Sequence, residues 1–113
     1  MNWDNIGYYI VYKHTLPTGE CYIGVTCKHP NRRWRNGEGY NRQPLFYSKI
    51  LKYGWDNITH EIVATFPNRH DAWTYEHNLI QSNKDNCLNI KGTSTTREAK
   101  IQRKKYVKKY GGY

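Results

Sequence analysis

Alternating apolar and polar residues predict two short strands near the start of the chain. The strands cover residues 7–12 and 21–26, which are rich in tyrosine and β-branched residues. Pro17-Thr18-Gly19 lies between them, and two β-rich runs around such a turn predict a hairpin.

The length of the turn sets which side chains face each other. A turn over residues 16–19 places Lys13 opposite Tyr22, and alternation along the strands then puts Tyr9 and Tyr22 on one sheet face with Lys13 beside them. Gly24 lies between them and, without a Cβ, permits close approach to the backbone. Two phenols and an ammonium around such a gap suit an anion such as phosphate, although tyrosine also favours strands for packing reasons alone.

Apolar spacing and helix-boundary residues predict three helices further along the chain. Pro30 opens a short helix, and residues 45–53 form a second that ends at Gly54. Residues 69–83 form the third, with a polar turn after it.

Two further strands complete the expected domain. One covers residues 58–66, with Ile62 and Ala64 on the same face, and a short final strand covers residues 87–90. Strands and helices mix without regular βαβ alternation, which predicts an α+β fold. We expect residues 1–92 to form one domain, a small, mostly antiparallel sheet flanked by helices.

The composition changes after residue 92. Thr95 and Glu98 fit a capping box, so a helix is expected in the tail over residues 93–113. This tail is either a solvated helix or an arm that tracks phosphates. Its basic residues are Arg97, Lys100, Arg103, Lys104, Lys105, Lys108 and Lys109.

The net charge of the whole chain is +9, with 18 lysines and arginines against 9 acidic residues. This balance favours a polyanionic partner. No apolar run approaches the roughly 18 residues that span a bilayer, and the first residues lack a signal-peptide pattern. We therefore expect a cytoplasmic protein that does not bind membranes.

The cysteines and histidines show no metal-binding or disulfide pattern. Cys21, Cys27 and Cys87 are odd in number and form no C-x-x-C pair, so we expect reduced thiols, with Cys21 directed away from the Tyr22 face. The five histidines are scattered, without the spacing of a zinc site.

Glu76 is the most informative single residue. It lies four residues after Ala72 and four before Ile80, on the apolar face of the predicted helix, where a carboxylate is costly unless it is paired or metal-bound. It is therefore either a ligand for a hard cation such as Mg²⁺ or a boundary residue that reaches an arginine.

A dense group of cations lies at the start of the short helix. Arg32, Arg33 and Arg35 flank Trp34. Guanidinium groups match phosphate oxygens and stay charged during chemistry, although a charged helix start is more often a solvated face.

Several segments together resemble a known family. In chain order they are Gly7-Tyr8-Tyr9, Tyr22-Ile23-Gly24, Arg33-Trp34, Glu76 in residues 76–80, and Asn89 in residues 87–90. This order and spacing resembles the GIY-YIG nuclease family, with Tyr8 in place of isoleucine in the first triplet. Residues 39–57 are similar to phage and bacterial members, and the resemblance covers roughly residues 6–92.

The resemblance implies hydrolysis of DNA phosphodiester bonds with one divalent ion, Mg²⁺ or Mn²⁺, leaving 5′-phosphate and 3′-hydroxyl ends. Tyr9 would act as general base or orient the water, with Tyr22 beside it. Arg33 would stabilise charge on the phosphate and Glu76 would hold the metal. Asn89 would brace the site, although a turn or strand-end role explains an asparagine there equally well.

Other residues are assigned to binding or proton transfer. Family members carry a histidine or tyrosine one turn after the arginine, where this chain has Gly37, so Tyr40 or His29 would have to substitute as the proton relay. The expected phosphate and DNA contacts are Lys13, Gly24, Arg32, Arg35, Arg97, Lys100, Arg103, Lys104 and Lys105.

Two other functions are compatible with the same residues. One is a non-catalytic nucleic-acid-binding module on this fold, and the other is an RNA-cleaving nuclease. For a DNA-cleaving nuclease we expect DNA as the partner, with RNA as the alternative. We also expect a monomer or weak dimer, in a bacterial or phage-infected cell.

Overall fold

A computed structural model of the protein describes residues 3–91. Its sheet has three antiparallel strands, β1 (Tyr9–Thr15), β2 (Cys21–Thr26) and β3 (Thr59–Phe66), in the order β2-β1-β3. Helices cover both faces, which confirms the predicted α+β fold. The predicted tail helix lies outside the described residues.

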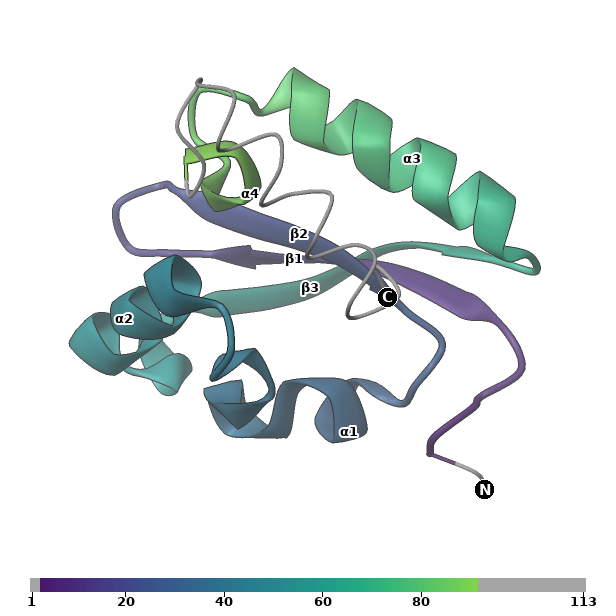
Figure 1. Ribbon diagram of the computed structural model, residues 1–113, viewed down its shortest axis with the longest axis horizontal. Helices are drawn as coiled ribbons and strands as arrows, with labels where there is room; N and C mark the ends of the chain where they lie inside the picture. Colours follow the sequence, from purple (N-terminus) through teal and green to yellow (C-terminus); the bar gives the residue numbers. More distant parts are fainter. Residues whose placement is uncertain (1–2, 92–113) are drawn as a thin grey trace.

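Helices form one layer on each side of the sheet (Figure 1). Helices α1 (Pro30–Trp34) and α2 (Pro44–Tyr53) cover one face, and α3 (Arg69–Ser82) covers the other. Residues 35–40 and 55–57 form 3₁₀ segments, and α4 (Leu88–Lys91) follows α3. Among these described helices none is long and apolar enough to cross a membrane.

Local signals explain the helix ends. Pro44 occupies the first turn of α2, where its missing N–H costs nothing. Gly54 ends the helix with a φ of 84° and donates its N–H to the Ile50 carbonyl at 2.8 Å.

The prediction of a strand over residues 87–90 is wrong except at Cys87, which forms a single bridge with Cys21 before α4 begins.

The pairing of β1 with β2 differs from the prediction by one residue. Tyr12 pairs with Gly24 and His14 pairs with Tyr22, so Lys13 is not opposite Tyr22. The cause is the turn, where Leu16 N donates to the Glu20 carbonyl at 2.8 Å and encloses a loop of three residues. Gly19 in that loop has a φ of 91°, as three-residue hairpin loops require.

A shift of one residue exchanges the two faces of a strand. Tyr12 and His14 therefore share the α1–α2 face with Tyr22. Tyr9 packs with the opposite cluster, whose buried members come from β1, β2, α3 and Cys87, and Lys13 pairs with Ile23 of that cluster. The prediction that Tyr9, Lys13 and Tyr22 share a face is thus wrong.

Strand β3 has an irregularity in its pairing with β1. Val11 pairs with Ala64 and Tyr12 pairs with Ile62, so Val63 forms a bulge. The bulge places Ile62 and Ala64 on opposite faces, and the prediction that they share one is wrong. Ala64 packs in the α3-side cluster, whereas Ile62 is 44% exposed.

Candidate active site

Aromatic rings from seven elements, namely the three strands, α1, α2 and the two 3₁₀ segments, meet between the sheet and the α1–α2 layer. Among them, His14 is 0% exposed and its ring centroid lies 4.8 to 5.6 Å from those of Trp34, Phe46 and Trp55. We call the group the aromatic cluster, and its members are Tyr12, His14, Tyr22, Trp34, Tyr40, Phe46, Trp55 and His60.

A chain of hydrogen bonds runs through the aromatic cluster. The Tyr40 hydroxyl lies 2.7 Å from Nε2 of His14, and Nδ1 of His14 lies 2.8 Å from Nδ1 of His60. Nε2 of His60 lies 2.9 Å from the Trp55 carbonyl oxygen. Every ring nitrogen of the two histidines therefore has a partner, as buried polar groups require.

Burial keeps the hydrogen-bonded side chains of Tyr40, His14 and His60 neutral. Burial, together with the smaller effects of the nearby His60 and Arg33, lowers the pKa of His14 to about 2. Burial also lowers the pKa of His60, against the opposing effects of the Trp55 carbonyl and Asp56. The pKa of Tyr40 is raised well above its ordinary value, mainly by burial.

Arg33 is the arginine that faces the aromatic cluster. Its guanidinium carbon lies 4.5 Å from the centroid of the Tyr40 ring, and its NH1 donates to the Gly39 carbonyl at 2.7 Å. The chain bends tightly around it through the left-handed residues Arg35 and Asn36. A Cβ on Gly39 would overlap the Arg33 carbonyl, which explains glycine at that position.

The neighbouring arginines lie elsewhere. Arg32 is exposed and pairs with Asp4 at 2.8 Å, and Arg35 is exposed at the end of α1. Of the three arginines, it is Arg33 whose guanidinium lies over a ring of the aromatic cluster.

Tyr22 lies at the half-buried edge of the cluster. Its ring stacks on Phe46 at 4.5 Å and meets Tyr40 edge-on at 5.4 Å. Gly24, next to it on β2, was expected to leave an open gap for an anion. The hydroxyl of Tyr12 instead occupies the space where a Gly24 Cβ would stand, so glycine is required there by a tyrosine of the same chain.

Asn89 continues the sheet beyond its β2 edge. Its Nδ2 donates to the Ile23 carbonyl at 2.7 Å, and its Oδ1 accepts the Ile23 N–H at 2.9 Å. The side-chain amide thus pairs with the strand as a neighbouring backbone would. Asn89 therefore braces strand β2, and it does so through the backbone of Ile23.

Glu76 lies on the other side of the sheet, in α3. It is half-buried, between the fully buried Ala72 and the nearly buried Ile80, whereas the neighbouring Trp73 is 50% exposed. Within residues 3–91 no three histidine, cysteine, aspartate or glutamate residues gather as a metal site. A half-buried carboxylate still fits a Mg²⁺ site in which water and substrate supply the other oxygens.

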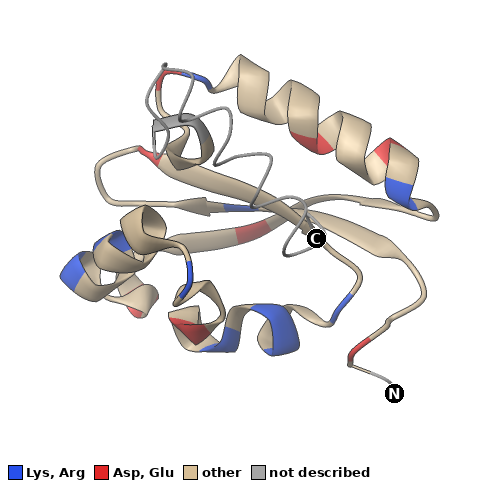
Figure 2. Ribbon diagram, in the orientation of Figure 1, with Lys and Arg blue, Asp and Glu red and all other residues tan. Residues whose placement is uncertain are grey.

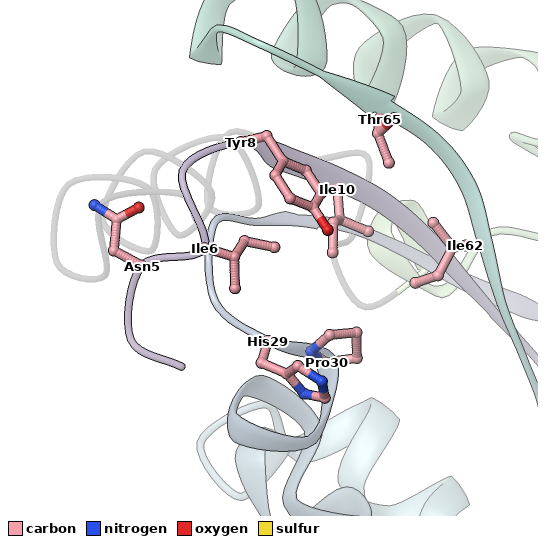
Figure 3. A pocket seen from close by; sticks show the side chains of 8 residues that line it. All are labelled: Asn5, Ile6, Tyr8, Ile10, His29, Pro30, Ile62 and Thr65. Carbon is pink, nitrogen blue, oxygen red and sulfur yellow. The ribbon is translucent and has the colours of Figure 1, made fainter. Parts of the chain in front are cut away.

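The two candidates for proton relay lie in different places. Tyr40 is at the centre of the aromatic cluster and 0% exposed. His29 instead caps α1 and stacks on Trp3 at 4.4 Å. It lines a cavity of about 430 Å³ to which no member of the aromatic cluster contributes (Figure 3).

Three polar members of this site, Tyr12, His14 and His60, were not predicted from the sequence. Tyr12 and His14 would have followed from the correct hairpin register, because both alternate onto the Tyr22 face. His60 is opposite His14 on β3, and no local signal marks it. The basic residues of the tail lie outside the described residues.

Comparison of the chain with protein families identifies one match. A family described as the GIY-YIG catalytic domain matches residues 5–89, and the chain belongs to that nuclease family. Membership implies an endonuclease-type hydrolase with a nucleic-acid substrate, and nucleases of this family generally use a divalent metal. No curated protein and no solved structure matched the chain.

The neutral, buried His14 predicts a loss of stability in acid. Unfolded histidine binds a proton below about pH 6.5, whereas folded His14 stays neutral until about pH 2. Stability therefore falls as pH drops below 6.5, by up to about 1.4 kcal/mol per pH unit from this one group. Urea unfolding between pH 7 and 4 measures it.

The variant His14→Gln removes the titrating group and should show a shallower decline with acid. His70→Ala, at an exposed position of α3, is the matched control and should keep the wild-type slope. Equal slopes for wild type and His14→Gln would mean that His14 does not titrate as its burial requires.

Proposed function

We propose that the protein is a metal-dependent endonuclease that hydrolyses DNA phosphodiester bonds and leaves 5′-phosphate and 3′-hydroxyl ends. The observation that carries the proposal is the position of Arg33. Its guanidinium lies over Tyr40 at 4.5 Å, at the half-buried edge of the aromatic cluster. Family membership supplies the reaction class, and the position of Arg33 next to the cluster's hydroxyl groups supports a phosphate-binding role for this cation.

Arg33 would bind the scissile phosphate and stabilise its negative charge. The contacts with Gly39 and Tyr40 hold the guanidinium in place before substrate arrives, and donors fixed in advance stabilise a transition state at no reorganisation cost.

Glu76 would hold the divalent ion. Because α1 and α3 cover opposite faces of the sheet, a substrate that contacts both Arg33 and an ion on Glu76 must reach around an edge of the sheet. When bound, such an ion supplies Lewis-acid stabilisation of charge on the phosphate and the leaving oxygen. A single carboxylate suits Mg²⁺, which keeps several waters and is often held by one or two carboxylates and substrate phosphates.

Tyr12 replaces Tyr9 in the proposed mechanism. Tyr12 shares the sheet face of Tyr22, and its hydroxyl lies against Gly24 of the Tyr22-Ile23-Gly24 triplet. Tyr9 packs on the opposite face. We assign the orientation of the attacking water to the Tyr12 hydroxyl, with Tyr22 at the more exposed edge of the same face.

The charge distribution favours approach of a polyanion from the α1–α2 side. Figure 2 shows basic residues along α1, α2 and their connection, whereas α3 carries its basic residue at its start. Phosphate contacts from Arg32 and Arg35, and from the basic tail, remain predictions. Such contacts add affinity without sequence preference and weaken with salt.

We predict that Arg33→Ala lowers the single-turnover cleavage rate by about two to three orders of magnitude, the usual cost of losing one transition-state donor. Arg32→Ala is the matched control, because this arginine pairs with Asp4 at the surface. It should mainly weaken binding. Equal losses for both variants at saturating DNA would refute the special role of Arg33.

We predict that Glu76→Gln abolishes cleavage of supercoiled plasmid in Mg²⁺ while binding of DNA persists. The amide keeps the shape of the side chain but binds a divalent cation poorly. The assay compares nicking with Mg²⁺, with Mn²⁺ and with EDTA, and circular dichroism checks the fold. Wild-type turnover of the variant would remove Glu76 as the metal ligand.

A further inference from the structure

The cavity of about 430 Å³ beside the start of α1 lies on the same sheet face as the aromatic cluster. Ile10 pairs with Thr65, and Ile62 pairs with Tyr12, so the side chains of these lining residues project to the face of Tyr12. The volume lies within the roughly 300–1,000 Å³ of small-molecule sites. The aromatic cluster contributes no lining residue, so the proposed chemistry does not account for this cavity.

The cavity has ring-bearing residues on two opposite sides and an apolar floor between them. Figure 3 shows the ring of Tyr8 reaching over the cavity on one side, with His29 and Pro30 closing it on the other. The imidazole of His29 is held in place, because it stacks on Trp3 at 4.4 Å and its Nδ1 accepts the Asn31 N–H at 3.2 Å. The apolar floor consists of Ile6, Ile10 and Ile62. Such a space suits a flat ring with apolar faces.

Polar groups lie at the edges of this apolar space. The Tyr8 hydroxyl points into the cavity, and Thr65 supplies a second hydroxyl (Figure 3). Asn5 lies at the outer rim, where its Oδ1 accepts the Gly7 N–H at 2.9 Å. A nucleobase has the complementary combination of apolar faces and hydrogen-bonding edges. Because hydroxyl groups both donate and accept, they accommodate any base and do not select a sequence.

Tyr8 is also the residue at which this chain departs from the first triplet of the family motif, where isoleucine is expected. Tyr8 and Ile62 are each 44% exposed, and Trp3, which stacks on His29, is 46% exposed. These are three of the six large apolar side chains that are exposed within residues 3–91. Exposed apolar groups that gather in one place mark a binding site. The departure from the motif thus places an aromatic ring at the mouth of a cavity.

Cations lie next to the cavity wall in the chain. Lys28 and Arg32 are exposed on either side of His29, and Arg33 donates its backbone N–H to the His29 carbonyl at 3.0 Å. Arg32 pairs with Asp4, but both side chains are more than half exposed, so this pair is weak and a phosphate can replace Asp4. A nucleotide with its base in the cavity would therefore have its phosphates beside these cations.

We propose that this cavity binds one unpaired nucleobase of the DNA substrate, stacked against Tyr8 and next to the phosphate that Arg33 binds. The proposal rests on the proposed nuclease function and deepens it by naming the substrate class. That class is DNA with an unpaired nucleotide near the cleaved bond, as in a bulge, a flap or a single-stranded stretch. A base inside an intact duplex would have to be extruded, and an unpaired base avoids most of that cost.

The test measures binding in EDTA, where a metal-dependent nuclease does not cleave, by fluorescence anisotropy of labelled DNA duplexes. One duplex is fully paired, one carries a single unpaired thymidine, and one carries an abasic nucleotide at the same position. The abasic duplex keeps the phosphates of the bulge and lacks only the base. We expect the thymidine duplex to bind about 5- to 150-fold more tightly than the abasic one, the scale of one base stacked on one aromatic ring. The fully paired duplex should bind no more tightly than the abasic one.

Variants on both sides of the cavity locate the effect. Tyr8→Ile restores the residue of the family motif and should bind the thymidine and abasic duplexes equally, whereas Tyr8→Phe keeps the ring and should keep the preference. Ile62→Trp fills the cavity from β3 and should abolish the preference while Tyr8 stays intact. Tyr75→Ile changes an exposed tyrosine of α3, and as the matched control it should keep the wild-type preference. Thermal unfolding checks that each variant is folded.

Each other outcome has a definite meaning. Equal wild-type affinity for the thymidine and abasic duplexes would overturn the base site, whether or not the protein cleaves DNA. A preference that survives in both Tyr8→Ile and Ile62→Trp would also overturn it, because the base would then bind elsewhere. A preference that these two variants abolish supports the site even if no divalent metal yields cleavage, and in that case only the nuclease function is overturned.

Discussion

The site depends on the register between β1 and β2. The three-residue loop that ends at Gly19 pairs Tyr12 with Gly24 and His14 with Tyr22. This pairing directs Tyr12, His14 and Tyr22 to the face covered by α1 and α2. A shift of one residue would turn Tyr12 and His14 into the cluster against α3 and break the contact between His14 and the Tyr40 hydroxyl.

The aromatic cluster combines a hydrophobic core with a polar chain. Its rings exclude water from His14, and a charged imidazole would lose its hydration there, so His14 must be neutral and fully hydrogen-bonded. Such networks stabilise a structure only when every member has a partner. Here the last partner is the Trp55 carbonyl, which can only accept, so Nε2 of His60 donates to it. One set of contacts therefore sets both the burial of the two histidines and the orientation of the His60 ring.

Features set by local residues were predictable from sequence. Pro44 and Gly54 defined α2 to within one residue, and the spacing around Ala72 and Ile80 defined α3. The family resemblance identified Arg33, and the structure places it against the aromatic cluster.

Features set by pairing were not predictable. The hairpin register depends on whether the loop holds two residues or three. The Val63 bulge is fixed only when β3 pairs with β1. For the same reason His60 carried no signal, since its role arises from a partner 46 positions away in the chain. Asn89 was expected to brace the site, but its pairing with Ile23 could not be inferred without the sheet edge.

The central claim is that Tyr12, and not Tyr9, belongs to the site with Tyr22 and Arg33. The most direct measurement compares single-turnover DNA cleavage by Tyr12→Phe and Tyr9→Phe, since each change removes one hydroxyl and keeps the ring. The structure-based account predicts a loss of about two orders of magnitude or more for Tyr12→Phe and a rate near wild type for Tyr9→Phe. A large loss for Tyr9→Phe with an unaffected Tyr12→Phe would contradict it.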